Sequence, residues 1–237
     1  MRYPTTSKIN ADKEKGNFMR WSKVIFGIII FTLVAISLVG CSSQTNTPSS
    51  TVSIKEEQAK KEEEKKRLET EKRQKLEQAL QKVTITRDEV ENLVWYEGLK
   101  PENINYNGLI PYLVEKEVWE KEKAVYMRFH AIYQGNNWVF MDKIIFKTDN
   151  NTYEIPVKLS ERKSKIISGG VLEWHDVPVD KELFDILTDI STSNKTIMRY
   201  RGDTERKDIV ITEKEKDNIK VMIDIYNGLN GMLITRN

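Results

Sequence analysis

The chain has 237 residues, of which 39% are hydrophobic and 31% charged, so it is long enough for one or two domains with buried cores. Residues 1–40 hold six of the 38 basic residues and two of the 36 acidic ones, which leaves 32 basic against 34 acidic residues in the remainder. This balance argues against the clustered basic face of a nucleic-acid-binding protein, and no nucleic-acid partner is expected. The single cysteine, Cys41, excludes an internal disulfide.

The N-terminal segment has the pattern of a secretory signal. Residues 24–40 are almost all apolar, and they follow the basic sequence Arg20-Trp21-Ser22-Lys23. The apolar run ends in Leu38-Val39-Gly40-Cys41, with a small residue where a signal peptidase cuts. An uncleaved membrane anchor is the alternative, because about 17 apolar residues can just span a bilayer.

The sequence Leu38-Val39-Gly40-Cys41 resembles the lipobox of bacterial lipoproteins. This resemblance implies that the Cys41 sulfur receives a diacylglycerol, and that the bond after Gly40 is then cut. Residues 1–40 are therefore interpreted as a signal peptide. Two acyl chains hold a protein stably, because each buried methylene contributes about 0.8 kcal/mol. The expected location is the extracytoplasmic face of the cell membrane.

Two low-complexity segments follow Cys41. Residues 41–53 are small and polar, which predicts a flexible tether. Residues 54–82 are rich in Lys, Glu, Gln and Arg and contain neither Gly nor Pro, which predicts a helix. Acidic residues precede basic ones by four positions, as in Glu57 with Lys61, so ion pairs support a solvated spacer. Weak self-association of 54–82 as a coiled coil is the alternative, although a sustained apolar heptad is missing.

Residues 83–237 have the composition of one globular domain. The run Thr86-Arg87-Asp88-Glu89 matches a capping box, which predicts a short helix that ends at Gly98. Apolar alternation and turn residues then predict an antiparallel meander. Its strands are expected at 125–133, 138–147, 152–159 and 171–177, with turns at 134–137 and 149–151 and a loop at 160–170.

Two helices are expected in the C-terminal part. Asp180 is a candidate N-cap, and Thr212 with Glu215 forms a second capping box. A strand is predicted at 196–201 between the two helices. Together the pattern predicts an α+β fold, with helices on one side of a largely antiparallel sheet.

Alternation assigns one face of the central strands to the core. Trp138, Phe140, Ile144 and Phe146 share one parity, and Tyr153, Ile155, Val157 and Leu159 share another. Their aromatic rings are interpreted as core residues and not as a ligand platform.

Four short C-terminal patterns are similar to sequences of uncharacterised envelope lipoproteins of Gram-positive-type bacteria. They are Gly-Asn-Asn-Trp-Val-Phe at 135–140, Glu-Trp-His-Asp at 173–176, Arg-Tyr-Arg-Gly-Asp at 199–203 and Thr-Glu-Lys-Glu-Lys at 212–216. This resemblance implies a location and no activity.

The sequence contains few candidate catalytic groups. His130 and His175 stand alone without metal-ligand spacing, so neither a metal nor another cofactor is expected. Glu173-Trp174-His175-Asp176 is the best acid-base candidate, because a carboxylate can set the pKa of a nearby imidazole. In a strand, Glu173 and His175 would share one face, and Trp174 and Asp176 the other. A packed tryptophan with solvated polar neighbours is the alternative.

Two further motifs have simpler structural interpretations. Residues 149–154 offer several oxygen ligands but lack the central Gly and the distal Glu of a calcium loop, so a hairpin turn is expected. Arg201-Gly202-Asp203 matches the tripeptide that integrins recognise, and a turn at a strand end is expected instead.

Three function classes remain open. A membrane-tethered binding module of the envelope is preferred, with an envelope protein, a wall polymer or a small solute as its ligand. An enzyme whose site is assembled from distant residues is the second class, and no catalytic residue can be named for it. The third is a structural spacer that self-associates through 54–82.

Overall fold

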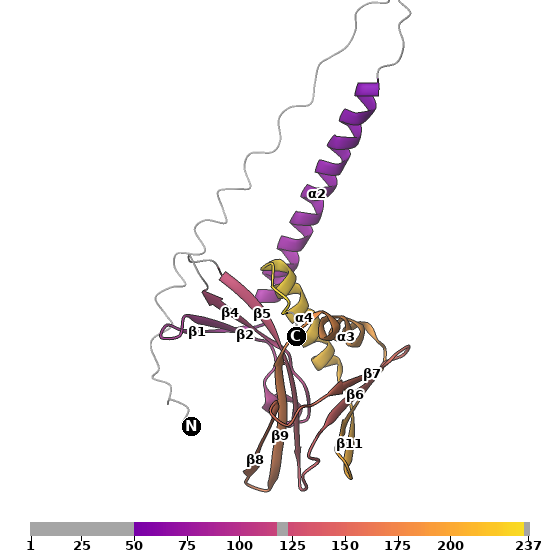
Figure 1. Ribbon diagram of the computed structural model, residues 1–237. Helices are drawn as coiled ribbons and strands as arrows, with labels where there is room; N and C mark the ends of the chain where they lie inside the picture. The colour runs from indigo at the N-terminus through magenta and orange to yellow at the C-terminus, as the bar shows by residue number, and fades with distance from the viewer. Residues whose placement is uncertain (1–49, 118–122, 235–237) are drawn as a thin grey trace, which may run out of the picture. The chain divides into compact units, whose positions relative to one another are not determined.

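The structure is a computed structural model that describes residues 50–117 and 123–234 (Figure 1). The predicted signal segment 1–40, the lipid-attachment residue Cys41 and most of the tether 41–53 lie outside the described residues. The fold is α+β, as predicted, but its strands form two antiparallel sheets.

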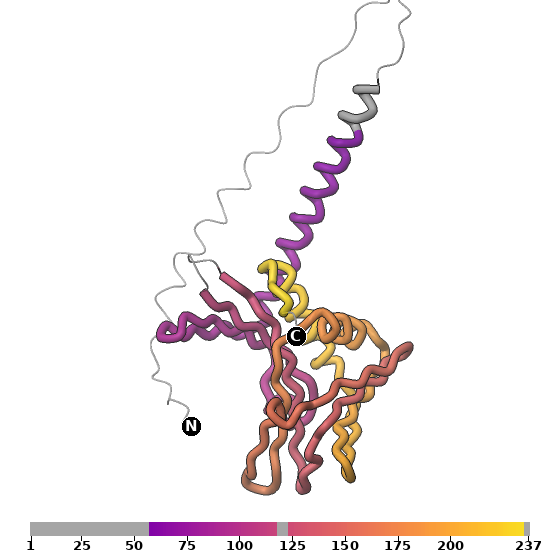
Figure 2. The backbone as a smooth tube through the Cα atoms, viewed as in Figure 1, coloured from indigo at the N-terminus to yellow at the C-terminus, as the bar shows by residue number. Residues whose placement is uncertain are grey.

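The described elements follow one another along the chain in Figures 1 and 2. They are α2 (Ser50–Leu80), β1 (Thr84–Asp88), β2 (Leu93–Glu97), the 3-10 helix η1 (Pro101–Ile104), β3 (Gly108–Leu109), β4 (Tyr112–Glu117), β5 (Lys123–Gly135), β6 (Lys143–Lys147), β7 (Thr152–Pro156), β8 (Arg162–Ile167), β9 (Gly170–Pro178), α3 (Lys181–Thr192), β10 (Ile197–Arg201), β11 (Arg206–Val210) and α4 (Glu213–Gly228).

The larger sheet has seven strands in the order β1-β2-β4-β5-β9-β8, with β3 paired to β5. Strand β5 is its centre and pairs with β9 along most of its length. On one face of β5, Met127, Phe129 and Ala131 are fully buried, and they join a core that includes Ile219 and Met222 of α4. Intervening residues such as Tyr126 and Arg128 point to the opposite face and stay partly exposed. We call this second face the outer face.

The smaller sheet has the order β11-β10-β6-β7. The predicted meander is therefore wrong in one connection, because β6 pairs with β7 and β10 and not with β5. Residues between Gly135 and Lys143 carry the chain from one sheet to the other. The predicted turn at 149–151 is confirmed as the β6–β7 connection. Ile144 and Phe146 are buried as expected, and they pack in the same core as the larger sheet.

Both predicted C-terminal helices are confirmed with their caps. The Leu183 amide donates to the Asp180 Oδ1 atom at 2.9 Å, which starts α3. The capping box of Thr212 and Glu215 starts α4, since the Glu215 amide donates to Thr212 and the Thr212 amide donates to Glu215. Apolar residues at three-and-four spacing, such as Leu187 and Met222, are buried on one side of each helix.

Two predicted local structures are wrong. The expected helix from Thr86 is instead the hairpin β1–β2, in which the Asp88 carboxylate accepts from the amides of Val90 and Glu91 within a turn. The expected loop after Ser160 contains strand β8, which pairs with β9 at the edge of the sheet. Its sequence is polar and exposed, so apolar alternation could not reveal it.

Helix α2 is a solvated helix over most of its length. Residues 57–75 are all exposed, and i,i+4 ion pairs join Glu57 to Lys61 and Glu62 to Lys66, as predicted. Arg67 and Arg73 instead pair with acidic residues four positions later in the chain.

The last turn of α2 packs into the domain, which was expected to begin only at residue 83. Ala79 is 3% exposed within the core cluster, and Leu76 and Leu80 pack against it. Gly228 at the end of α4 lies so close to Leu76 that a Cβ atom there would contact it at 2.7 Å. Residues 51–237 accordingly form one compact unit.

Removal of this turn is expected to destabilise the domain. A chain that begins at residue 83 should unfold with a free energy about 2–4 kcal/mol lower than one that begins at residue 70, because apolar contacts of Leu76, Ala79 and Leu80 are lost. Urea denaturation measures the difference. A chain from residue 51 is the control and should match the chain from residue 70, since residues 57–75 are exposed. Equal stability of the two shorter chains would contradict the role of this turn.

Candidate functional site

Aromatic side chains gather on the outer face of the larger sheet, where the strands place them in two neighbouring rows. In the first row Trp95 of β2, Val114 of β4 and Tyr126 of β5 are cross-strand neighbours. In the second row Tyr112 of β4 and Arg128 of β5 are neighbours, followed by Pro178 of β9. All six side chains are partly exposed.

These six residues and Ile234 line a groove with a volume of about 410 Å³. The Trp95 and Tyr112 rings lie with centroids 5.7 Å apart and planes inclined by 30°. Ile234 belongs to the C-terminal segment, where it forms a parallel bridge with Asp180. A concave, mostly apolar surface with few polar groups is typical of a ligand site, and its volume is in the usual range. We call these seven residues the groove.

The polar group of the groove is a paired guanidinium. The Arg128 Nε atom donates to the Asp176 Oδ1 atom at 2.9 Å, and its Nη2 atom donates to the Asp176 carbonyl at 3.0 Å. The Tyr112 hydroxyl donates to the Asp176 Oδ2 atom at 2.8 Å. The two charged side chains are only 27% and 24% exposed, so their opposite charges cancel at a half-buried position. The groove therefore has a fixed polar end without a net charge.

Two further groups beside this pair have perturbed acidities. Burial and the neighbouring Asp176 carboxylate raise the pKa of the Tyr112 hydroxyl above its usual value. Burial lowers the pKa of His130, whose ring makes an edge contact with Tyr112 at 6.1 Å. Both groups are therefore neutral near pH 7, which extends the neutral character of this face.

The structure divides the predicted acid-base motif 173–176 between the two faces of the sheet, as its alternation predicted. Asp176 joins the groove through Arg128 and Tyr112. Glu173 and His175 lie on the inner face with 0% exposure. The alternative interpretation, a packed tryptophan with solvated polar neighbours, is wrong. Trp174 is partly exposed, whereas its neighbours Glu173 and His175 are buried.

Glu173 holds the connection between the two sheets in place. Its carboxylate accepts hydrogen bonds from the amides of Val139 at 2.6 Å, Phe140 at 3.0 Å and Met141 at 3.0 Å. A buried carboxylate requires such partners, since desolvation without them is costly. Gly202 packs against the carbonyls of Val139 and Phe140 so closely that a Cβ atom would overlap them. The connection between the two sheets is therefore held from both sides.

This connection corrects part of the predicted core. Phe140 has a positive φ of 52° and is 56% exposed, although it was assigned to the buried face. Its ring stacks on Trp138 at 5.7 Å, and the Arg162 guanidinium lies 5.5 Å from the ring centroid. Leu159, also assigned to the core, is 76% exposed beyond the end of β7. Alternation fails at both positions because neither residue lies within a strand.

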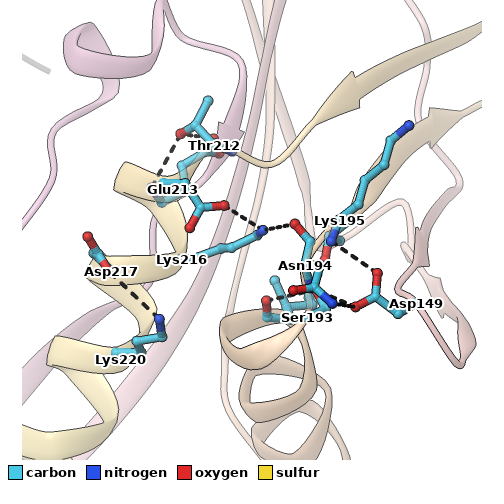
Figure 3. A network of polar contacts seen from close by, with 12 residues as sticks. Asp149, Ser193, Asn194, Lys195, Thr212, Glu213, Lys216, Asp217 and Lys220 are labelled. Carbon is cyan, nitrogen blue, oxygen red and sulfur yellow. Dashed lines mark hydrogen bonds and ion pairs between the residues drawn. The ribbon is translucent and has the colours of Figure 1, made fainter.

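The remaining polar clusters stabilise connections. Lys216 of α4 is only 2% exposed, and its Nζ atom donates to the Asn194 carbonyl and the Glu213 carboxylate at 2.7 Å each. Figure 3 shows these contacts. Asp149 accepts from the amides of Asn194 and Lys195, and these bonds lower the pKa of its carboxyl. Asp149, in the segment 149–154 where a hairpin turn was expected, therefore anchors the β6–β7 turn to the segment between α3 and β10. The turn predicted at Arg201–Asp203 is confirmed as the β10–β11 connection.

Over the ranges 50–117 and 123–234, no three His, Cys, Asp or Glu side chains form a group that could hold a metal ion. Among the helices in those ranges, none combines the length and apolar character needed to cross a membrane.

Sequence reasoning did not identify the groove. Trp95, Tyr112 and Tyr126 come from three strands, two of which were not predicted, and only pairing of those strands aligns them. Comparisons with protein-family models, with curated proteins and with solved structures found no match to this chain, so the groove is characterised by its own geometry.

Proposed function

We propose that this chain is a lipid-anchored binding protein of the bacterial cell envelope, and that the groove is its ligand site. The single observation that carries the binding role is the partly exposed aromatic groove with the paired Arg128 and Asp176 at one end. Soluble surfaces seldom concentrate aromatic rings without a ligand or partner. The lipobox at Cys41 supports the location on the extracytoplasmic face of the membrane.

The charged helix fits this role as a spacer. Helix α2, Ser50–Leu80, extends on the order of 45 Å at about 1.5 Å per residue. Its exposed residues and i,i+4 ion pairs allow it to stand in solvent, with its last turn fixed to the domain. An anchored domain on such a spacer can reach ligands within an envelope layer. Self-association through 54–82 remains a separate prediction.

A thermal-shift experiment with the full-length chain in detergent tests the binding role. Envelope extract is expected to raise the melting temperature of the wild-type chain by about 5 °C, because a ligand that binds only the folded state stabilises it by roughly 2–3 kcal/mol at a hundred times its Kd. The variants Trp95→Ala and Tyr126→Ala should lose most of this shift.

Tyr106→Ala is the matched control, because Tyr106 is also a partly exposed tyrosine but lies in the connection between η1 and β3, outside the groove. It should keep the wild-type shift. Circular dichroism of each variant without extract confirms that its fold is intact. An equal shift in the wild type and in both groove variants, or no shift in the wild type, would contradict the proposed site.

A further inference from the structure

We propose that the groove binds a neutral saccharide, as a segment of a wall glycan, an inference that rests on the proposed binding function. The Arg128 guanidinium is paired with the Asp176 carboxylate, and among the described residues that line the groove Arg128 is the only charged one. Nucleic acids and anionic polymers require unpaired cations along their path, so this site does not suit them.

The polar end of the groove offers both hydrogen-bond donors and acceptors. The Asp176 carboxylate only accepts, whereas the Arg128 guanidinium only donates, and both lie at the same end of the groove. Within the described part of the chain, the Nη1 atom of Arg128 has no hydrogen-bond acceptor, and each Asp176 oxygen has lone pairs beyond the bonds from Arg128 and Tyr112. A hydroxyl group both donates and accepts, so neighbouring hydroxyls of a sugar can pair with both residues.

A proline-rich peptide is the main competitor, since aromatic grooves also bind that conformation. Such a peptide presents mainly carbonyl acceptors, because proline has no amide hydrogen. Its carbonyls could pair with Arg128 but would leave the Asp176 carboxylate facing further acceptors. The polar end of the groove therefore favours a polyhydroxylated ligand over a peptide.

The aromatic rings of the groove suit the faces of sugar rings. The negative faces of aromatic rings attract the polarised C–H groups of a sugar ring, and Trp95, Tyr112 and Tyr126 supply three rings from adjacent strands. The two rows of groove residues lie two positions apart along the strands, or about 7 Å. A volume of about 410 Å³ suits one or two sugar rings, which matches a glycan segment lying across the sheet.

Titration calorimetry with the full-length chain in detergent tests this class of ligand. The probes are the tetramer of N-acetylglucosamine, cellotetraose and a decaproline peptide. At least one tetrasaccharide is expected to bind, and Trp95→Ala and Tyr126→Ala should weaken that binding at least tenfold. Tyr112→Phe, which keeps the ring and frees the Asp176 Oδ2 atom, should change the affinity less than Tyr126→Ala, and Tyr106→Ala should not change it.

The outcomes separate the two proposals. Binding of neither tetrasaccharide, binding that survives Trp95→Ala, or binding of decaproline in their place would overturn the saccharide assignment. If the thermal shift with envelope extract still depends on Trp95 and Tyr126 in that case, the proposed function stands with another ligand. Loss of that dependence would reject the proposed function itself.

Discussion

Replacement of Glu173 by alanine is expected to lower the free energy of unfolding by about 3–5 kcal/mol. The carboxylate is fully buried and accepts from three consecutive amides, at Val139, Phe140 and Met141. Alanine would leave these donors without their partner and would open a cavity beneath the connection between the sheets. Two of the three donors are attached to buried residues, so water cannot readily replace the lost acceptor.

Urea denaturation of Glu173→Ala measures this loss. Glu173→Gln retains one acceptor oxygen and should lose an intermediate amount. Glu154→Ala is the matched control, because Glu154 is an exposed residue whose carboxylate pairs with Lys143 on the protein surface. Surface ion pairs contribute about 0–1 kcal/mol, so this control should remain near the wild type. A loss below about 1 kcal/mol in Glu173→Ala would show that the connection is held by other contacts.

Replacement of Cys41 by alanine is expected to abolish lipid attachment completely. The thiolate is the only nucleophile of its kind in the chain, and alanine has no sulfur to acylate. Cleavage after Gly40 should fail with it, so the precursor keeps its apolar segment. Metabolic labelling with a fatty acid, followed by mass measurement of the product, tests both effects.

Ser42→Ala is the neighbouring control and should be labelled and cleaved as in the wild type. Label that persists in Cys41→Ala would refute the lipobox assignment. A full-length wild-type product without label would instead favour the uncleaved anchor.

The sequence alone predicted structures whose causes are local. The caps at Asp180 and Thr212 depend on side chains and amides within three residues of each other, and both helices begin where expected. Strands β5 and β9 bury one of their two faces, so apolar and polar residues alternate along them and the sequence reveals both strands. The ion pairs of α2 also follow from the four-residue spacing of opposite charges. Arg67 and Arg73, however, pair with the acidic residue four positions after them and not with the one before.

Local sequence patterns gave wrong predictions where the same residue pattern is compatible with two different local structures. An aspartate that accepts nearby amides can begin a helix or hold a turn, and Asp88 holds the turn of the β1–β2 hairpin. Alternation also misplaced Phe140, because the strand expected around it is a connection between two sheets. Strand β8 was not predicted, because an edge strand buries few side chains and its sequence can be polar throughout.

Only the tertiary structure decided where the groove lies and which carboxylate serves it. The parity of residues 173–176 followed from the geometry of a strand, but parity does not say which face meets the core. That choice depended on packing of the inner face in the common core, where Phe129 contacts Phe146 and the buried Glu173 accepts from the amides of the connection between the sheets. Asp176 was left on the outer face beside Arg128. Trp95 and Tyr126 lie far apart in the sequence and become neighbours of Val114 only through strand pairing. Such long-range register leaves no local signal, because it arises from the burial of the opposite face.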